Sequence, residues 1–198
     1  MTLVVGIDPG IHGALALYDT DAKSVTNTWD VPTFKTIINR KERERIHAAA
    51  MSDMAVMFKM LGVSLAVIEA VGGLPRQSGA GSFVFGYATG LVYMAMVCHK
   101  IPVESISSQI WKKTMRVPGK GFSSPATDRT VNQIIVQRAD EIMPSASHLW
   151  RGTQGGLKVG RAEAALIAKY GADYLLHGPK KGFVTEGRLA YDKVELGA

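Results

Sequence analysis

The first 31 residues alternate short apolar runs with turn residues. Runs rich in Val, Ile and Leu predict strands at residues 2–8, 13–18 and 24–31. Pro and Gly follow the first run, and an Asp-Thr-Asp turn follows the second. Connections this short predict a three-stranded antiparallel meander.

After this meander the apolar residues take helical spacing. Residues 45–61 repeat an apolar position every three or four residues up to Gly62, which predicts a helix. The charged segment "NRKERER" (39–45) is interpreted as its solvated start. "LAVIEAV" (65–71) is a continuous apolar run with one acid, typical of a buried strand. The remaining pattern predicts helices at 83–97, 107–114, 127–142 and 161–176 and a strand at 102–106.

This order of elements predicts the fold class. Three antiparallel strands followed by alternating helices and strands indicate an α/β domain, with a mixed sheet covered by helices on both faces. Residues 1–177 are expected to form this one domain. Residues 178–198 lack a clear apolar period and are expected to form a loosely ordered tail.

Composition limits the class of binding partner and the cellular compartment to be expected for this chain. A net charge of +6 and a pI near 9.5 favour a polyanionic partner such as nucleic acid, although a basic protein without such a partner has the same balance. The single cysteine, Cys98, excludes an internal disulfide framework and is interpreted as a small core residue. We find no signal peptide and expect a cytoplasmic protein, bacterial or phage-encoded, or one of an organellar matrix, without membrane association.

Three acids are candidates for a common site. Asp8 ends the first strand, and Glu69 interrupts an apolar strand that can lie parallel beside it. Their carboxyl ends would then meet at one edge of the sheet, where ligands bind in α/β folds. Glu163 lies in the first predicted turn of the last helix, among alanines that allow close packing. Neighbouring buried acids need a counter-charge, which a divalent cation such as Mg²⁺ or Mn²⁺ supplies.

Each acid also has a plainer interpretation. Asp8 can stabilise the turn that begins with Pro-Gly, and Glu163 can interact with the helix dipole. Glu69 is harder to explain in this way, because a charged residue in a buried strand is rare without a partner.

The sequences around these acids resemble a known family. "GIDPGIHGALAL" (6–17), "AVIEAV" (66–71) and "GRAEAALIAKYG" (160–171) resemble the three acidic motifs of the RuvC-type Holliday junction resolvases, in the ribonuclease H-like superfamily. The "GRAEA" form is most similar to the phage and chloroplast branch. The resemblance implies a homodimeric endonuclease of DNA recombination and repair that hydrolyses four-way junctions. It further implies two Mg²⁺ ions (or Mn²⁺) held by Asp8, Glu69 and Glu163, with Asp8 between them.

The sequence departs from this family at one place. The resolvases usually carry a fourth acid three to five residues before the last one, where this chain has Lys158, Val159 and Gly160. Three acids with extra water ligands can suffice, Lys158 can turn to a phosphate, or the protein can bind junctions and cut them slowly or not at all. A ribonuclease for RNA–DNA hybrids fits the basic charge equally well. An ATP-binding protein of the actin and sugar-kinase type would need about twice this length.

Basic residues supply candidate DNA contacts. They cluster around a Gly- and Pro-containing loop and include Lys112, Lys113, Arg116, Lys120 and Arg129. A solvated basic face would have the same composition. By the resemblance, Lys112 stands where these resolvases carry a phosphate-binding lysine, and "GGLPRQSGAG" (72–81), with Arg76, follows Glu69 where they probe the junction centre. Lys158 is the remaining candidate.

Overall fold

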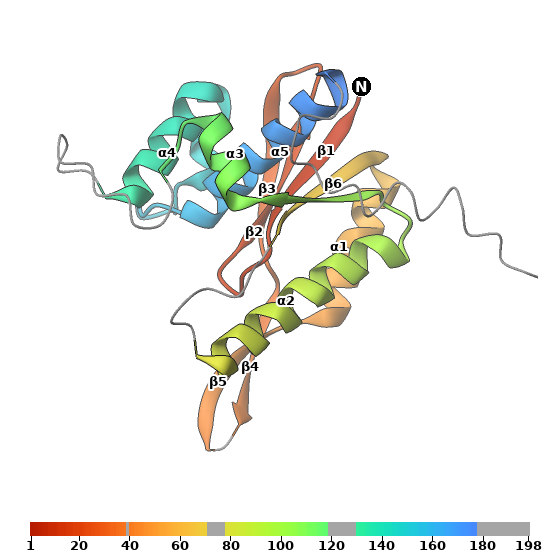
Figure 1. Ribbon diagram of the computed structural model, residues 1–198, viewed down its shortest axis with the longest axis vertical. Helices are drawn as coiled ribbons and strands as arrows, with labels where there is room; N and C mark the ends of the chain where they lie inside the picture. Colours follow the sequence, from red (N-terminus) through yellow and green to blue (C-terminus); the bar gives the residue numbers. More distant parts are fainter. Residues whose placement is uncertain (39, 71–77, 119–129, 178–198) are drawn as a thin grey trace, which may run out of the picture.

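The computed structural model describes residues 1–38, 40–70, 78–118 and 130–177 (Figure 1). The strands are β1 (Leu3–Asp8), β2 (Ala14–Asp19), β3 (Ser24–Asp30), β4 (Thr33–Ile38), β5 (Lys41–Ile46), β6 (Val63–Ala70) and β7 (Val103–Ser107). The helices are α1 (Ala48–Met60), α2 (Gly79–Cys98), α3 (Ser108–Met115), α4 (Val131–Ile142), the 3-10 helix η1 (Pro144–Trp150) and α5 (Val159–His177).

Five strands form one mixed sheet in the order β3-β2-β1-β6-β7. The meander β1–β2–β3 is antiparallel, whereas β1–β6 and β6–β7 are parallel. This arrangement confirms the predicted α/β class. It also confirms that the first strand and the "LAVIEAV" strand are parallel neighbours, which places their carboxyl ends at the same edge.

Side chains that alternate along the strands build one core on each face of the sheet. Val4 packs with α3, α4 and α5 on one face, whereas Val5 and Ile7 pack with α1 and α2 on the other. Figure 1 shows these two groups of helices on opposite sides of the sheet. Helices therefore cover both faces, as predicted.

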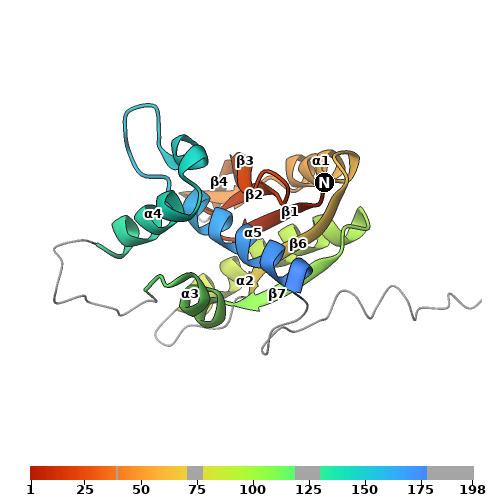
Figure 2. The same ribbon diagram turned by 90° about the horizontal axis from the view of Figure 1, so that it is seen from above.

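Helix α5 lies unusually close to the middle of the sheet. Figure 2 shows it running beside β1 and β6. Gly6 allows this approach, because a Cβ there would overlap the backbone of Ala164 and Ala168. Gly171 has the same role later in the helix, against the side chain of Val67. The small residues of "GRAEAALIAKYG" thus set the height of α5 above β1.

The interpretation of "NRKERER" as a helix start is wrong. Thr33–Ile38 and Lys41–Ile46 form a separate two-stranded antiparallel sheet, β4–β5, and α1 begins only at Ala48 after the cap residue His47. Lys, Glu and Arg favour a helix in isolation, but "TFKTII" offers a strand partner rich in β-branched residues. Pairing with this strand overrides the local preference.

Two smaller differences concern α4 and Cys98. Helix α4 begins at Val131 with Thr130 in a capping box, four residues later than the predicted start. Cys98 is exposed rather than in the core. It lies two residues, or about 200° of helix rotation, beyond the buried Met96. The predicted tail 178–198 lies outside the described residues.

Helix α2 is long and apolar. Its segment Gly81–Cys98 could cross a membrane by length and composition alone, with a mean hydropathy of 1.5. A single such helix is a weak indication, because core helices meet the same criteria. Ala88, Val92 and Met96 of α2 are buried against the sheet.

Candidate functional site

Asp8 stands at the carboxyl end of β1, half-buried beside β6. The last paired residues before it are Ile7 and Ile68, so Asp8 and Glu69 follow each other across the parallel pair. Burial raises the pKa of Asp8 to about 7, and the negative charges of Glu163 and Glu69 raise it further. The nearest compensation is weak, since the Gly10 N–H donates to Asp8 Oδ1 over 3.5 Å.

Glu69 shares this unfavourable environment. Burial raises its pKa, the nearby positive charge of Lys112 opposes the shift, and the negative charge of Glu163 adds to it. The side chains of Trp111 and Ser108 also lower its pKa. The buried Trp111 N–H has no hydrogen-bond partner of good geometry among the described residues, so we attribute its influence to proximity alone.

Glu163 reaches the site from α5. The neighbouring Ala162, Ala164 and Ala165 are fully buried against the sheet, which holds this part of the helix close to β1. The helix starts two residues earlier than predicted, so Glu163 lies beyond its first turn. The helix-dipole interpretation of Glu163 therefore loses support, because that effect fades after the first turn.

Lys112 is the counter-charge of this acidic group. Its Nζ lies 2.9 Å from Glu163 Oε1, and the two side chains are only 17% and 18% exposed. The same ammonium lowers the pKa of both Asp8 and Glu69. It also lies over the Trp111 ring, 5.0 Å from its centroid. One lysine thus faces three carboxylates from β1, β6 and α5.

The three acids are of the chemical type that binds divalent cations, but their side chains are too far apart to coordinate one ion together. Carboxylate oxygens are the donors that Mg²⁺ and Mn²⁺ prefer. After burial, the charges of Glu163 and Glu69 are the next causes of the raised pKa of Asp8, and Lys112 offsets them only in part. Within the described ranges, however, no three His, Cys, Asp or Glu side chains lie close enough together to hold a metal ion. Metal binding would require these side chains to move together and Glu163 to leave Lys112.

The structure describes residues 158–160, where the resolvases usually carry a fourth acid. A Cβ at Gly160 would lie 3.3 Å from Asp8 Oδ2 and 2.9 Å from the His12 carbonyl oxygen, so this glycine faces the site directly. Lys158 does not: its Nζ lies 3.7 Å from Asp30 Oδ2. The positive charge of Lys158 is therefore directed to Asp30 and not to the three acids.

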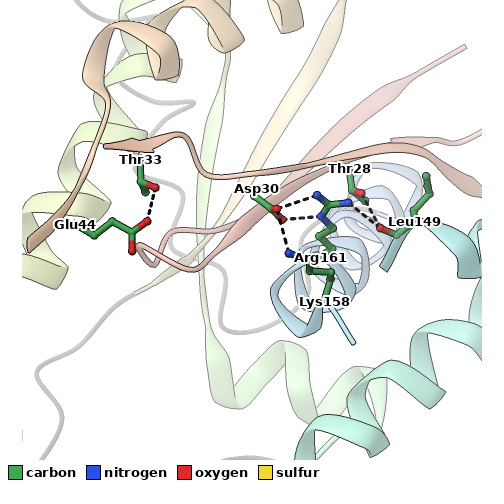
Figure 3. A network of polar contacts seen from close by, with 7 residues as sticks. All are labelled: Thr28, Asp30, Thr33, Glu44, Leu149, Lys158 and Arg161. Carbon is green, nitrogen blue, oxygen red and sulfur yellow. Dashed lines mark hydrogen bonds and ion pairs between the residues drawn. The ribbon is translucent and has the colours of Figure 1, made fainter. Parts of the chain in front are cut away.

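The residues around Asp30 form a polar network that the sequence did not predict (Figure 3). Arg161 donates from Nε and Nη2 to the two oxygens of Asp30, over 2.6 and 2.9 Å. This pairing, with a smaller contribution from Lys158, lowers the pKa of Asp30. The network borders a pocket of about 450 Å³ that also includes Thr33 and Glu44. No sequence signal links residues 30 and 161.

The other predicted DNA contacts are only partly described. Lys113 is exposed at the end of α3, and Arg116 is exposed just beyond it with a φ of 58°. Lys120, Arg129 and Arg76 lie outside the described residues. All of these residues remain predicted contacts.

Comparisons with known proteins identify the fold through solved structures but assign the chain to no sequence family. No protein-family model and no curated protein matches the chain. Among solved structures, it is similar to Thermus thermophilus RuvC in complex with a Holliday junction substrate. The identity is 14%, the coverage 89% of this chain and 97% of that chain, and the TM-score 0.52. A second structure of T. thermophilus RuvC has 15% identity, the same coverage and a TM-score of 0.49. The first likeness, together with the sheet order, shows that this chain has the ribonuclease H-like fold of RuvC.

Proposed function

We propose that this chain is a structure-selective DNA endonuclease that cuts four-way junctions with the help of divalent cations. The observation that carries the proposal is the convergence of Asp8, Glu69 and Glu163, where burial first and then the charges of Glu163 and Glu69 raise the pKa of Asp8 to about 7. Three unrelated elements bring these charges to one edge of the sheet, at considerable electrostatic cost. The structural likeness supports it, since that RuvC is described in complex with a Holliday junction substrate.

The proposed cofactor is Mg²⁺ or Mn²⁺, two ions per site. Asp8, Glu69 and Glu163 would be the protein ligands that hold these ions. When bound, the ions would activate a water molecule and stabilise the leaving 3′ oxygen. Gly160 lies close to Asp8 Oδ2, in the segment where the resolvases carry a fourth acid, and adds no carboxylate of its own.

Lys112 would change partner during this process. Its ammonium now neutralises part of the acidic group through Glu163. Once Glu163 turns to a cation, Lys112 is free to bind a phosphate of the DNA backbone. Lys113 and Lys158, with Lys120, Arg129 and Arg76, are the further proposed DNA contacts.

The proposed enzyme acts as a homodimer through α2. Phe83, Tyr87 and Met94 share one face of this helix and are 73%, 51% and 51% exposed. An exposed apolar face without charged residues is typical of a subunit interface. Sedimentation of Phe83→Asp tests this, with Met60→Asp on α1 as the control, because Met60 is also exposed. Only the α2 variant should become monomeric.

The activity is tested by cleavage of a synthetic four-way junction in Mg²⁺ or Mn²⁺. Asp8→Asn should abolish cutting and retain junction binding, because it removes a metal ligand and leaves the basic surface intact. The matched control is Asp53→Asn, an exposed acid of α1 outside the acidic group. Cutting by Asp8→Asn at the wild-type rate would refute the role of this site.

A catalytically impaired junction-binding protein is the second candidate. It is favoured by the Lys112–Glu163 ion pair and by the absence of a ready-made metal group among the described residues. Wild-type protein that binds the junction but cuts it at no metal concentration would support this candidate over the nuclease.

A further inference from the structure

The β4–β5 hairpin separates the charges of "KERER" (41–45) onto two faces. Side chains alternate along a strand, so Lys41, Arg43 and Arg45 lie on one face and Glu42 and Glu44 on the other. Directly paired residues share a face, which adds the β4 partners of each set. The basic face comprises Phe34, Thr36, Ile38, Lys41, Arg43 and Arg45.

The acidic residues of the opposite face are already occupied. Glu42 pairs with Lys35 over 2.8 Å, and Glu44 accepts a 2.6 Å hydrogen bond from the Thr33 hydroxyl. His12 approaches Glu44 to 3.8 Å. These contacts keep the negative charge of the hairpin on this face and away from the basic one.

The cations of the basic face have no such partners. Within the part of the chain that the structure describes, Lys41, Arg43 and Arg45 make no ion pair, and the hydrogen bond of Arg45 goes to the Glu44 carbonyl oxygen. Lys41 and Arg43 are exposed, as is Arg40 in the hairpin turn. Phe34 and Ile38 are 45% and 38% exposed. At the root of the hairpin, Phe34 and Arg45 line a pocket with Phe83 and Tyr87 of α2. Toward the turn, the face presents the exposed Lys41 and Arg43, which have no ion-pair partner among the described residues.

The root of the hairpin lies next to the acidic group. Thr33 and Glu44 line the same 450 Å³ pocket as His12, Gly13 and Gly160, which adjoin Asp8. Figure 3 shows Thr33 and Glu44 across the strands from the Asp30 network, and Figure 1 shows the hairpin extending past the start of α2. Strands of six residues reach about 20 Å. That length matches about six base pairs of B-form DNA.

We propose that the basic face of β4–β5 binds the phosphate backbone of a DNA duplex arm that leads away from the acidic group. Cations at alternate positions repeat about every 6.8 Å along the strand and can each meet a phosphate. A two-stranded ribbon has dimensions that duplex grooves accept. The choice of a duplex arm rests on the proposed function.

The salt dependence of DNA binding tests this surface. The triple variant Lys41→Gln, Arg43→Gln, Arg45→Gln should reduce the slope of log K against log salt by about 2.7, at about 0.9 per phosphate contact. Because the variant loses less affinity as salt rises, the ratio of its affinity to that of wild type should increase about 40-fold from 50 to 200 mM salt. The probe is a four-way junction with 12-base-pair arms, in EDTA to prevent cutting. The control is Lys35→Gln, an exposed cation of the opposite face, which should leave the slope unchanged.

A second variant and a second probe complete the experiment. Lys41→Gln with Arg43→Gln changes only exposed side chains, so its melting temperature should equal that of wild type while the slope falls by about 1.8. With arms of four base pairs the difference between wild type and the triple variant should shrink, since the hairpin then extends past the end of the arm. A wild-type slope in the triple variant, or an equal loss in Lys35→Gln, would overturn the proposal.

The outcome for the hairpin can be separated from that for the nuclease. Wild-type protein that cuts junctions while the triple variant keeps its slope overturns the hairpin proposal alone. Protein that binds duplex DNA through the hairpin and never cuts supports the hairpin and contradicts the nuclease. Wild-type protein without affinity for DNA at any salt concentration overturns the hairpin proposal, and an acidic protein surface then becomes the better partner.

Discussion

The cost of burying Asp8 can be measured as protein stability. Burial, Glu163 and Glu69 raise its pKa from 3.8 to about 7 in the folded chain. Between these two pH values the folded protein holds a proton that the unfolded chain has released. The free energy of unfolding therefore decreases as the pH rises from about 4 to 7 and then levels off. Asp8→Asn removes this loss, so the variant should be the more stable protein at pH 8 without metal.

The magnitude follows from the pKa. A rise from 3.8 to about 7 corresponds to about 4 kcal/mol at 1.36 kcal/mol per pH unit. Asp8 is only half-buried, and part of the repulsion is shared with Glu69 and Glu163, so we expect about half of this value. About half of this loss falls above pH 5.5, so between pH 5.5 and 8 wild type should lose about 1 kcal/mol relative to Asp8→Asn.

Urea unfolding in EDTA at pH 5.5 and pH 8 provides the assay. Asp53→Asn is the control and should follow wild type at both pH values. Addition of Mg²⁺ at pH 8 should stabilise wild type and leave Asp8→Asn unchanged. If the stability difference between Asp8→Asn and wild type is the same at pH 5.5 and pH 8, Asp8 does not titrate as a buried carboxyl and the reasoning fails.

Three further predictions concern the elements that support the site. Gly6→Ala should lower the free energy of unfolding by about 3 kcal/mol or more, because the added methyl group overlaps the α5 backbone; a urea midpoint near wild type would contradict this. Lys112→Met should destabilise the metal-free protein at pH 8 by about 1–3 kcal/mol and should do so less at pH 5.5, where the acids bind protons, as measured by urea unfolding. Arg161→Met should abolish the stability that the lowered pKa of Asp30 contributes at neutral pH; in wild type this contribution is lost on acidification below pH 4, and equal acid midpoints would argue against it.

The core of the site could be predicted from the sequence. Asp8 ends an apolar run and Glu69 interrupts another, and both patterns are local. The order of the elements allows these two strands to be parallel neighbours, and the structure confirms that they are. Glu163 was recognisable from the alanines around it, because only small residues allow a helix to lie so close to a sheet. The metal-binding role of these acids stays a prediction.

The structure corrected the sequence where local preference and pairing compete. Lys, Glu and Arg, which favour a helix, make up residues 40–45, and their partner strand lies earlier in the chain. As a helix, this segment would carry positive and negative charges mixed around its surface. As a strand, it places three cations on one face and two acids on the other, which gives it a different chemistry with the same residues.

By itself, the sequence determined the fold class, the parallel pair and the edge at which the acids end, because these follow from periodicity and the order of elements. Only the tertiary structure decided which charges meet. Lys112 and Glu163 are 51 residues apart, and Asp30 and Arg161 are 131 apart. Such contacts depend on the height of α5 above β1 and on the path of β4–β5. Electrostatic energy depends on distance in space, which no local pattern along the chain encodes.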